Sequence, residues 1–288
     1  MSTLAHLLRG ATQELQAAGI EDASLEAEVL LRHTLRLDRA RLYARLQEGL
    51  STADEAAFRS LLARRLAHEP TAYIVEHREF YGLDFETTPA ALIPRPETEL
   101  LVDEALARLR ERPDPGGRPL IVDVGTGNGA IAVALAVHLP LAILLAVDLS
   151  REALALASRN ARRHGVEGRI SFVRADLLAP LARPADVIVA NLPYVRTADW
   201  EALPREIREH EPRLALDGGP EGLREIGRLL EQAPPCLAPG GSLLVEVGPP
   251  QAAAALELAY RCFSNGRAHV LPDAAGLERM LAIGLPSA

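Results

Sequence analysis

Residues Leu120–Ala130 have the sequence LIVDVGTGNGA, an apolar run typical of a buried strand followed by a turn with three glycines. Glycine lets the backbone turn sharply and lets a ligand approach it closely. Gly125, Gly127 and Ala130 also satisfy the dinucleotide-binding pattern G-x-G-x-x-G/A, which alone is weak evidence. Because a helical run begins at Ala130, the context favours a nucleotide-type binding loop over a plain strand-to-helix turn.

Strand-like and helical runs alternate from this loop to the C-terminus. The strand-like runs lie at residues 120–124, 142–147, 170–173, 186–190, 242–247, 268–271 and 279–283. Such alternation predicts an α/β fold with a mostly parallel, doubly wound, Rossmann-like sheet. Ligands of these sheets bind outside the carboxyl ends of the strands, which is where the glycine loop lies.

The chain before this sheet has a different pattern. Within residues 1–75, leucines and other apolar residues recur at spacings of three and four, which predicts a small helical bundle. Residues 76–96 bring together aromatic side chains and a glycine, typical of a short hairpin, followed by a proline-rich linker. We therefore expect a helical domain at 1–75 with a packing or docking role, a hairpin and linker at 76–96, and the α/β domain at 97–288.

Two acidic positions follow the second and third predicted strands. Asp148 ends the second strand, where a carboxylate can accept hydrogen bonds from both ribose hydroxyls of a nucleoside. It could instead cap the helix that begins at residue 151, although Ser150 is the better candidate for that cap. Asp176 and Leu177 follow the third strand and could contact the amino group and ring of an adenine, or simply form a turn.

The tetrad Asn191-Leu192-Pro193-Tyr194 follows the fourth strand, at the same predicted edge of the sheet. An amide or aryl-amine nitrogen is a poor nucleophile because its lone pair is delocalised. The Asn191 side-chain oxygen and the Leu192 carbonyl could accept both of its N–H groups and aim the lone pair at a methyl carbon. Pro193 stiffens the loop, and the Tyr194 ring could stack on a planar acceptor and favour a sulfonium cation. With the glycine loop and Asp148, the tetrad predicts an S-adenosylmethionine-dependent N-methyltransferase, with an ordinary Asn-x-Pro turn as the alternative.

Composition excludes several other classes of protein. The net charge of −8 argues against a broad nucleic-acid-binding surface. The chain has no lysine, which excludes a Walker-type phosphate lysine and a pyridoxal Schiff base. Neither the 2 cysteines nor the 8 histidines have the spacing of metal ligands. This spacing predicts no metal site. Since no segment is typical of a signal peptide or a membrane span, we also expect a cytoplasmic protein.

Together these motifs resemble the peptide chain release factor glutamine N5-methyltransferases, the PrmC/HemK family, essentially from end to end. The matching residues are EFYG at 79–82, LIPRPETE at 92–99, DVGTGNG at 123–129, NLPY at 191–194, Glu211-Pro212, Gly218-Gly219 with Gly222-Leu223, Pro239-Gly240-Gly241, and Glu246-Val247-Gly248 with Gln251. The resemblance implies a class I S-adenosylmethionine methyltransferase fold with an antiparallel C-terminal strand. The helical N-terminal segment fits that family's extra domain.

The resemblance also implies the reaction, which is methylation of the glutamine side chain in the Gly-Gly-Gln motif of bacterial class-1 release factors. By position in the family, the residues that bind S-adenosylmethionine would be Gly125, Thr126, Gly127, Asn128, Gly129, Asp148, Leu177 and Asn191. Asp176 is added to this set because it follows the third predicted strand. The tetrad Asn191–Tyr194 would hold the glutamine amide. The N-terminal helices would dock the release factor, and neither a nucleic acid nor a membrane is expected as a partner.

One residue departs from the family's usual tetrad, Asn-Pro-Pro-Tyr, because position 192 is leucine. The proposed contact at this position is a backbone carbonyl, which either residue supplies. Asn-Leu-Pro-Tyr also resembles the tetrad of ribosomal-RNA adenine N6-methyltransferases, so an exocyclic adenine amine of RNA or DNA is the alternative acceptor. A ribosomal-protein glutamine is another. A nicotinamide oxidoreductase or a non-catalytic binding module would leave the tetrad unexplained.

Overall fold

The computed structural model describes residues 3–111 and 117–287, and the chain divides into two compact units. Unit 1 comprises Met1–His77 and Pro204–His210, and unit 2 comprises Arg78–Leu203 and Glu211–Ala288. The short segment Pro204–His210 thus belongs with the N-terminal helices, although it follows most of the α/β sheet in the sequence.

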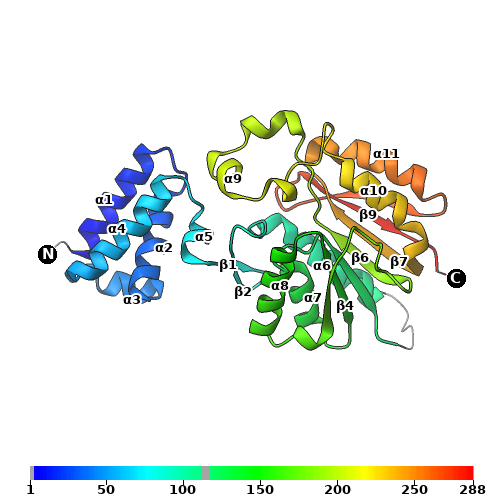
Figure 1. Cartoon of the computed structure of the whole chain (residues 1–288), viewed down its shortest axis with the longest axis horizontal. Coiled ribbons are helices and arrows are strands. Elements are labelled where there is room, and N and C mark those ends of the chain that lie inside the picture. The colour runs from blue at the N-terminus through cyan, green and yellow to red at the C-terminus, as the bar shows by residue number, and fades with distance from the viewer. Residues whose placement is uncertain (1–2, 112–116, 288) are drawn as a thin grey trace. The chain divides into compact units, whose positions relative to one another are not determined.

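Unit 1 consists of helices whose apolar faces share one core (Figure 1). In chain order the helices that contribute to this core are α1 (Leu4–Ala17), α2 (Ala23–Leu35), α3 (Arg39–Ala44), α4 (Thr52–Leu66) and α5 (Thr71–Val75). The later segment adds α9 (Arg205–His210), which has no residue in the core. The spacing of three and four residues places Leu30 and Phe58 fully inside this core. Ser51 caps α4 by accepting a hydrogen bond of 3.1 Å from the Asp54 N–H.

A buried arginine joins α9 to the other helices of unit 1. Arg65 is 4% exposed. Its Nε lies 3.2 Å from a carboxylate oxygen of Glu26 in α2, and a terminal nitrogen lies 2.6 Å from one of Glu206 in α9. Because a buried guanidinium without such partners is strongly destabilising, these ion pairs hold α9 in unit 1.

The strands form two sheets in the described part of the chain. β1 (His77–Phe80) and β2 (Leu83–Glu86) make a two-stranded sheet. Tyr81 and Gly82 join them with positive φ angles of 54° and 70°, the combination that tight hairpins use. The larger sheet has the order β5-β4-β3-β6-β7-β9-β8. Its strands are β3 (Leu120–Val124), β4 (Ile143–Asp148), β5 (Ile170–Arg174), β6 (Ala185–Ala190), β7 (Leu237–Glu246), β8 (Arg267–Pro272) and β9 (Glu278–Gly284).

Helices cover both faces of the larger sheet (Figure 1). Alternate strand residues face opposite cores: Ile121 packs with α6 (Glu99–Glu111), α7 (Ala130–His138) and α8 (Arg151–Arg163), whereas Val122 packs with α10 (Arg224–Gln232) and α11 (Ala252–Cys262). Short 3₁₀ helices join the longer elements: η1 (Pro96–Thr98), η2 (Glu167–Arg169), η3 (Thr197–Ala202), η4 (Arg213–Ala215), η5 (Pro234–Cys236) and η6 (Pro249–Gln251). Within the described ranges, no helix is long and apolar enough to cross a membrane.

Five neighbouring strands of the larger sheet, β5 to β7 in the sheet order, are parallel, and β9 runs antiparallel to both of its neighbours. The mostly parallel sheet with an antiparallel C-terminal strand is therefore confirmed. The chain fills one side of β3 with β4 and β5 before it crosses to β6 on the other side. This reversal of strand order is the place where ligands of doubly wound sheets bind.

Candidate functional site

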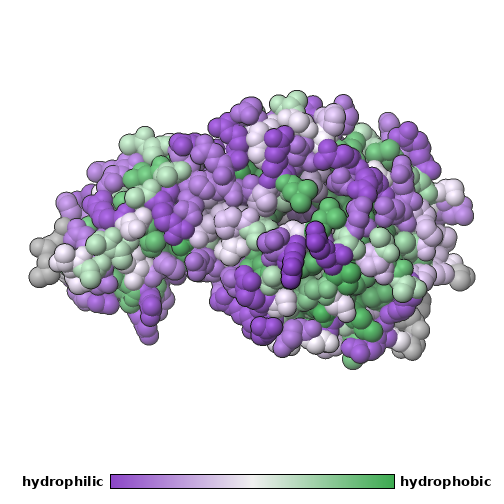
Figure 2. Space-filling model, viewed as in Figure 1, coloured by the Kyte–Doolittle hydropathy of each residue, from purple (hydrophilic) through white to green (hydrophobic). Residues whose placement is uncertain are grey.

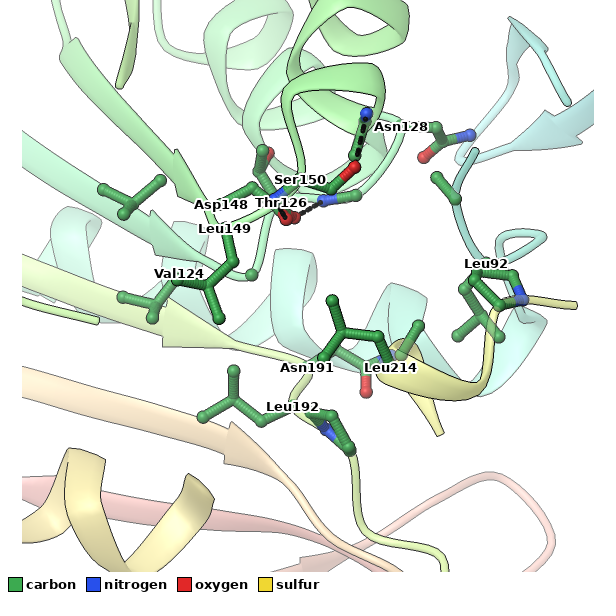
Figure 3. Close-up of a pocket in the computed structure, with 18 of the residues that line it drawn as sticks. Leu92, Val124, Thr126, Asn128, Asp148, Leu149, Ser150, Asn191, Leu192 and Leu214 are labelled. Atoms are coloured by element: carbon green, nitrogen blue, oxygen red, sulfur yellow. Dashed lines mark hydrogen bonds between the residues drawn. The ribbon is translucent and has the colours of Figure 1, made fainter. Parts of the chain in front are cut away.

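A pocket opens at the carboxyl ends of β3, β4 and β6, within unit 2 (Figure 3). Asp148, Thr126 and Asn128 lie on one side of it, and Asn191 and Leu214 lie on the other. Hydrophobic residues gather at the mouth of a hollow in this unit (Figure 2). Among the residues that line the pocket, Leu214 is 64% exposed, so part of the pocket wall is apolar surface open to solvent.

Most of the residues predicted for the site line this one pocket. These are Gly125, Thr126, Gly127, Asn128, Asp148, Asp176, Leu177, Asn191, Leu192 and Pro193. Gly129 and Tyr194 are not among its lining residues. Residues 90–95 form a further wall of the pocket, and residues 92–95 of this wall lie in a segment that matches the family.

The glycine loop is shaped by its contacts with neighbouring strands and helices. The backbone N–H groups of Gly125 and Thr126 both donate to the Val147 carbonyl, at 2.8 and 3.0 Å. Gly125 has a φ of 72°, and a methyl group there would lie 3.0 Å from the Leu192 side chain. At Gly129 a methyl group would lie 2.9 Å from Ala157, so this glycine serves the close packing of α7 on α8.

Asp148 is held by two backbone N–H groups. Gly127 donates to one carboxylate oxygen at 2.9 Å and Ser150 donates to the other at 2.8 Å. Ser150, not Asp148, caps α8, with its hydroxyl accepting from the Ala153 N–H at 3.1 Å. Each oxygen of Asp148 keeps a second lone pair, so the carboxylate is oriented and can still accept two hydroxyl groups.

Asp123 lies beneath the loop and was not predicted as a site residue. One of its oxygens accepts from the Thr126 hydroxyl at 2.6 Å and from the Ala132 N–H at 3.2 Å. Burial and, to a lesser degree, the charge of the nearby Asp148 raise the pKa of this carboxyl to about 7. Its other oxygen and Nδ2 of Asn128 are buried without a hydrogen-bond partner among the described residues. Asn128 lines the pocket, so a polar ligand there can accept from its Nδ2, whereas Asp123 does not line the pocket.

Asp176 is more than a turn residue. One carboxylate oxygen accepts a hydrogen bond from Arg228 of α10, and the other is buried with no partner within the part of the chain that the structure describes. Leu177, which follows it, is 6% exposed and has a φ of 49°. The pair therefore forms a fixed edge of the pocket.

The wall formed by residues 90–95 is anchored by a buried carboxylate. Glu211 is 6% exposed and accepts hydrogen bonds from the Ile93 N–H, at 3.3 Å, and from the Arg95 guanidinium. Arg95 also lines the pocket. The match of Glu211 to the family pattern was the sequence signal for this contact, but its partner lies 116 residues away.

The predicted acceptor loop makes polar contacts behind the pocket. Nδ2 of Asn191 donates to the Thr98 hydroxyl at 3.1 Å, and this hydroxyl donates to Glu246 at 2.7 Å. The Tyr194 hydroxyl donates to the other oxygen of Glu246 at 3.1 Å. Thr98 lines the pocket and was not predicted from the sequence.

Three glycines of the matched motifs leave room for the backbone of this loop. A methyl group at Gly222 would lie 2.2 Å from the Tyr194 carbonyl oxygen, and one at Gly218 would lie 2.5 Å from the Pro193 oxygen. At Gly248 it would lie 3.2 Å from the Tyr194 ring. The Val195 N–H also donates to the Leu216 carbonyl at 2.9 Å. Side chains at the three glycine positions would thus displace the loop.

Comparisons with known proteins agree with this arrangement. Residues 6–75 match the PrmC N-terminal domain, and residues 121–211 match a methyltransferase domain. The release factor glutamine methyltransferase of Moorella thermoacetica is 45% identical over 278 residues, which are 96% of each chain. That of Geobacter sulfurreducens is 44% identical over 93% of this chain and 91% of its own. A methyltransferase from Pyrococcus furiosus, 19% identical, shares the fold with a TM-score of 0.51 over 78% of this chain and 98% of its own. The chain belongs to the family of release factor glutamine methyltransferases.

Proposed function

We propose that this protein transfers the methyl group of S-adenosylmethionine to the side-chain amide nitrogen of the glutamine in the Gly-Gly-Gln motif of class-1 release factors. One observation supports this most directly. The Asn191 carboxamide is turned with its nitrogen toward Thr98, at the wall opposite Asp148. Its oxygen makes no hydrogen bond with the described residues in this arrangement, so it can accept from the N–H of an incoming amide.

The residues around the pocket fit S-adenosylmethionine. The oriented Asp148 carboxylate suits the two ribose hydroxyls, and Asp176 with Leu177 suits the adenine. The backbone of residues 125–128 and the free N–H groups of Asn128 suit the amino-acid end of the molecule. When bound, the group supplies an electrophilic methyl carbon on a sulfonium. No metal-ligand cluster of histidine, cysteine, aspartate and glutamate occurs among the described residues.

Catalysis by the protein is then mostly orientation. Asn191 and the Leu192 carbonyl would accept the two N–H groups of the glutamine amide, which leaves the nitrogen lone pair facing the methyl group. Holding reacting atoms about 3–3.5 Å apart in this way lowers the barrier without a covalent intermediate. The new N–C bond would form as the carbon–sulfur bond of the sulfonium breaks, so the donor would leave as a neutral thioether and the amide nitrogen would lose one proton to solvent.

The N-terminal helices and the location of the protein complete the proposal. We assign docking of the release factor to the helical domain at residues 1–75. A protein acceptor suits the net charge of −8 better than a phosphate backbone does, so no nucleic-acid partner is proposed. Cys236 and Cys262 are free thiols, as in the reducing cytoplasm where release factors act.

The test is methyl transfer from labelled S-adenosylmethionine to three acceptors in parallel: an intact release factor, its variant without the Gly-Gly-Gln glutamine, and ribosomal RNA. Label on the intact factor alone would support both the acceptor and the atom. Label on the RNA alone would favour the adenine alternative that Leu192 raises. Equal labelling of the intact factor and its variant would refute the assigned glutamine.

A further inference from the structure

A buried carboxylate lies behind the acceptor loop and is linked to it twice, once by a direct hydrogen bond and once through a threonine hydroxyl. Glu246 ends β7 and is 1% exposed. One oxygen accepts from Thr98, at the end of η1, and the other accepts from Tyr194, in the loop after β6. Thr98 in turn accepts from Asn191. Residues from three distant segments therefore form one hydrogen-bonded chain that ends on the Asn191 carboxamide.

We propose that Glu246 is a positioning residue that sets, through the Thr98 hydroxyl, which end of the Asn191 carboxamide faces the substrate. The inference rests on the proposed function, because it concerns how Asn191 receives the glutamine amide. It assigns to Glu246 a role in orientation and none in contact with the reacting atoms, since Glu246 is not among the residues that line the pocket.

The number of available protons fixes the direction of each hydrogen bond between Glu246, Thr98 and Asn191. An ionised carboxylate only accepts hydrogen bonds, so the one hydroxyl proton of Thr98 is committed to Glu246. The oxygen of Thr98 can then only accept from Asn191, which draws the NH₂ end of the carboxamide toward Thr98. The oxygen end of Asn191 is left for the substrate amide. The reverse orientation would present N–H groups to N–H groups and would not bind it.

The surroundings of Glu246 are unusual for a carboxylate that serves stability alone. It has two hydrogen bonds from hydroxyl groups and no direct ion pair with a cation among the described residues. Arg279, whose charge acts on Glu246, is paired with Asp273 at 3.2 Å. Burying a carboxylate on these terms is costly, and an apolar residue would avoid the cost. A role in orienting the Asn191 carboxamide explains why a carboxylate is buried here despite its unfavourable free energy of burial.

The groups that face Glu246 also make its charge sensitive to pH. Burial and, to a lesser degree, the charge of Glu97 raise the pKa of Glu246 to about 7, against the opposing effects of the hydrogen bonds from Thr98 and Tyr194 and of the charge of Arg279. A protonated Glu246 can donate to Thr98, which frees the Thr98 hydroxyl to donate to the Asn191 oxygen. Protonation would therefore turn the carboxamide, so kcat should fall as the pH drops through about 7.

The first variant is Glu246→Gln, which keeps the shape but removes the charge. We expect kcat with the release factor to fall roughly 10- to 100-fold, while the Kd for S-adenosylmethionine changes less than about twofold. The loss of kcat below neutral pH should disappear in the variant. The control is Asp186→Asn, which neutralises another buried carboxylate, one that accepts from the Leu120 N–H at the opposite end of the sheet. It should leave kcat and its pH profile as in the unmodified protein.

A second pair of variants decides the matter if Glu246→Gln fails to fold. Thr98→Ser keeps the hydroxyl relay, and Thr98→Val removes it at nearly constant volume. We expect near-normal kcat for serine and the low kcat of Glu246→Gln for valine. Equal kcat for the two, or a kcat and pH profile of Glu246→Gln like those of the unmodified enzyme, would overturn the inference. No transfer by the unmodified enzyme to any release factor would instead overturn the proposed function.

Discussion

Asp148 accepts hydrogen bonds with both carboxylate oxygens, from the backbone N–H groups of Gly127 and Ser150. These contacts settle a choice that single-residue patterns leave open, because Ser150 caps α8 and Asp148 is free to face the pocket. Asn191 is similarly fixed at its nitrogen end by Thr98. At the scale of the residue, each side chain proposed to hold a ligand is oriented by partners that leave its remaining hydrogen-bonding capacity toward the pocket.

Replacing Asp148 with asparagine should weaken binding of S-adenosylmethionine. An amide has one acceptor oxygen where the carboxylate has two, so a ribose hydroxyl or a backbone N–H group loses its partner. We expect the Kd, measured by calorimetry, to rise roughly tenfold, in line with about 1.5 kcal/mol for a hydrogen bond to a charged group. Glu152→Gln, an exposed change in the first turn of α8, is the control. An unchanged Kd for Asp148→Asn would remove this residue from the cofactor site.

Replacing Asn191 with alanine should affect the chemical step more than cofactor binding. The variant loses the side-chain oxygen that is proposed to orient the glutamine amide, so we expect kcat to fall roughly 100-fold or more. The Kd for S-adenosylmethionine should change far less, which separate titration and single-turnover measurements would resolve. A variant with near-normal turnover would contradict the role assigned to Asn191.

At the scale of the element, the loop after β6 is shaped by a segment that follows it by more than twenty residues. The Gly218 N–H donates to the Val195 carbonyl at 2.8 Å, and the Thr197 N–H donates to the Gly219 carbonyl at 2.9 Å. Gly222 then sits against the Tyr194 carbonyl with a φ of 72°. A motif that gives no chemical signal in the sequence is thereby part of the support for the tetrad.

The substitution Gly222→Ala tests this support. Its methyl group would lie 2.2 Å from the Tyr194 carbonyl oxygen, and the left-handed backbone adds about 1–2 kcal/mol of strain. We expect a lower Tm in thermal unfolding and a lower kcat in the methyl-transfer assay. Gly227→Ala, in α10 with nothing within 4 Å, is the matched control and should leave kcat unchanged or raise the Tm slightly. If both variants behave alike, the loop does not depend on Gly222.

At the scale of the whole molecule, the proposed function assigns methyl transfer to unit 2 and docking of the release factor to unit 1. Unit 2 contains the whole pocket, including every residue that lines it. Unit 1 has its own apolar core and no lining residue of that pocket. This separation agrees with an acceptor-docking role for the N-terminal helices, which the proposed function assigns to them.

Deleting residues 1–75 should then raise the KM for the intact release factor at least roughly tenfold, because docking contacts contribute binding without taking part in the chemistry. The Kd for S-adenosylmethionine should stay nearly constant. A short peptide with the Gly-Gly-Gln sequence is the control substrate, since it has nothing to dock, and its kinetics should be similar for both proteins. An unchanged KM for the intact factor would contradict the docking role.

Local sequence alone was enough to predict the fold and much of the site. The alternation of apolar strands with helices specifies a doubly wound sheet, because each strand of such a sheet is buried on both faces by helices. The carboxyl ends of its parallel strands meet at one edge. Because Gly125, Asp148 and Asn191 each lie at or just after the end of a strand, the sequence is enough to predict that they lie in one pocket. Membership of the family was likewise predicted and is confirmed.

Other features depend on tertiary structure, because they join residues that no local pattern relates. Thr98 and Glu246 are 148 residues apart in sequence, yet one hydrogen bond places Thr98 behind Asn191. The six-residue helix α9 is strongly charged and short, so its sequence gives no sign that it belongs to unit 1, to which it is linked by an ion pair with the buried Arg65. The sequence by itself determined which groups reach the ligand edge, since the position of each strand along the chain and its apolar pattern are local properties. The tertiary structure decided how those groups are oriented, because orientation depends on hydrogen-bond partners brought together only when the chain is folded.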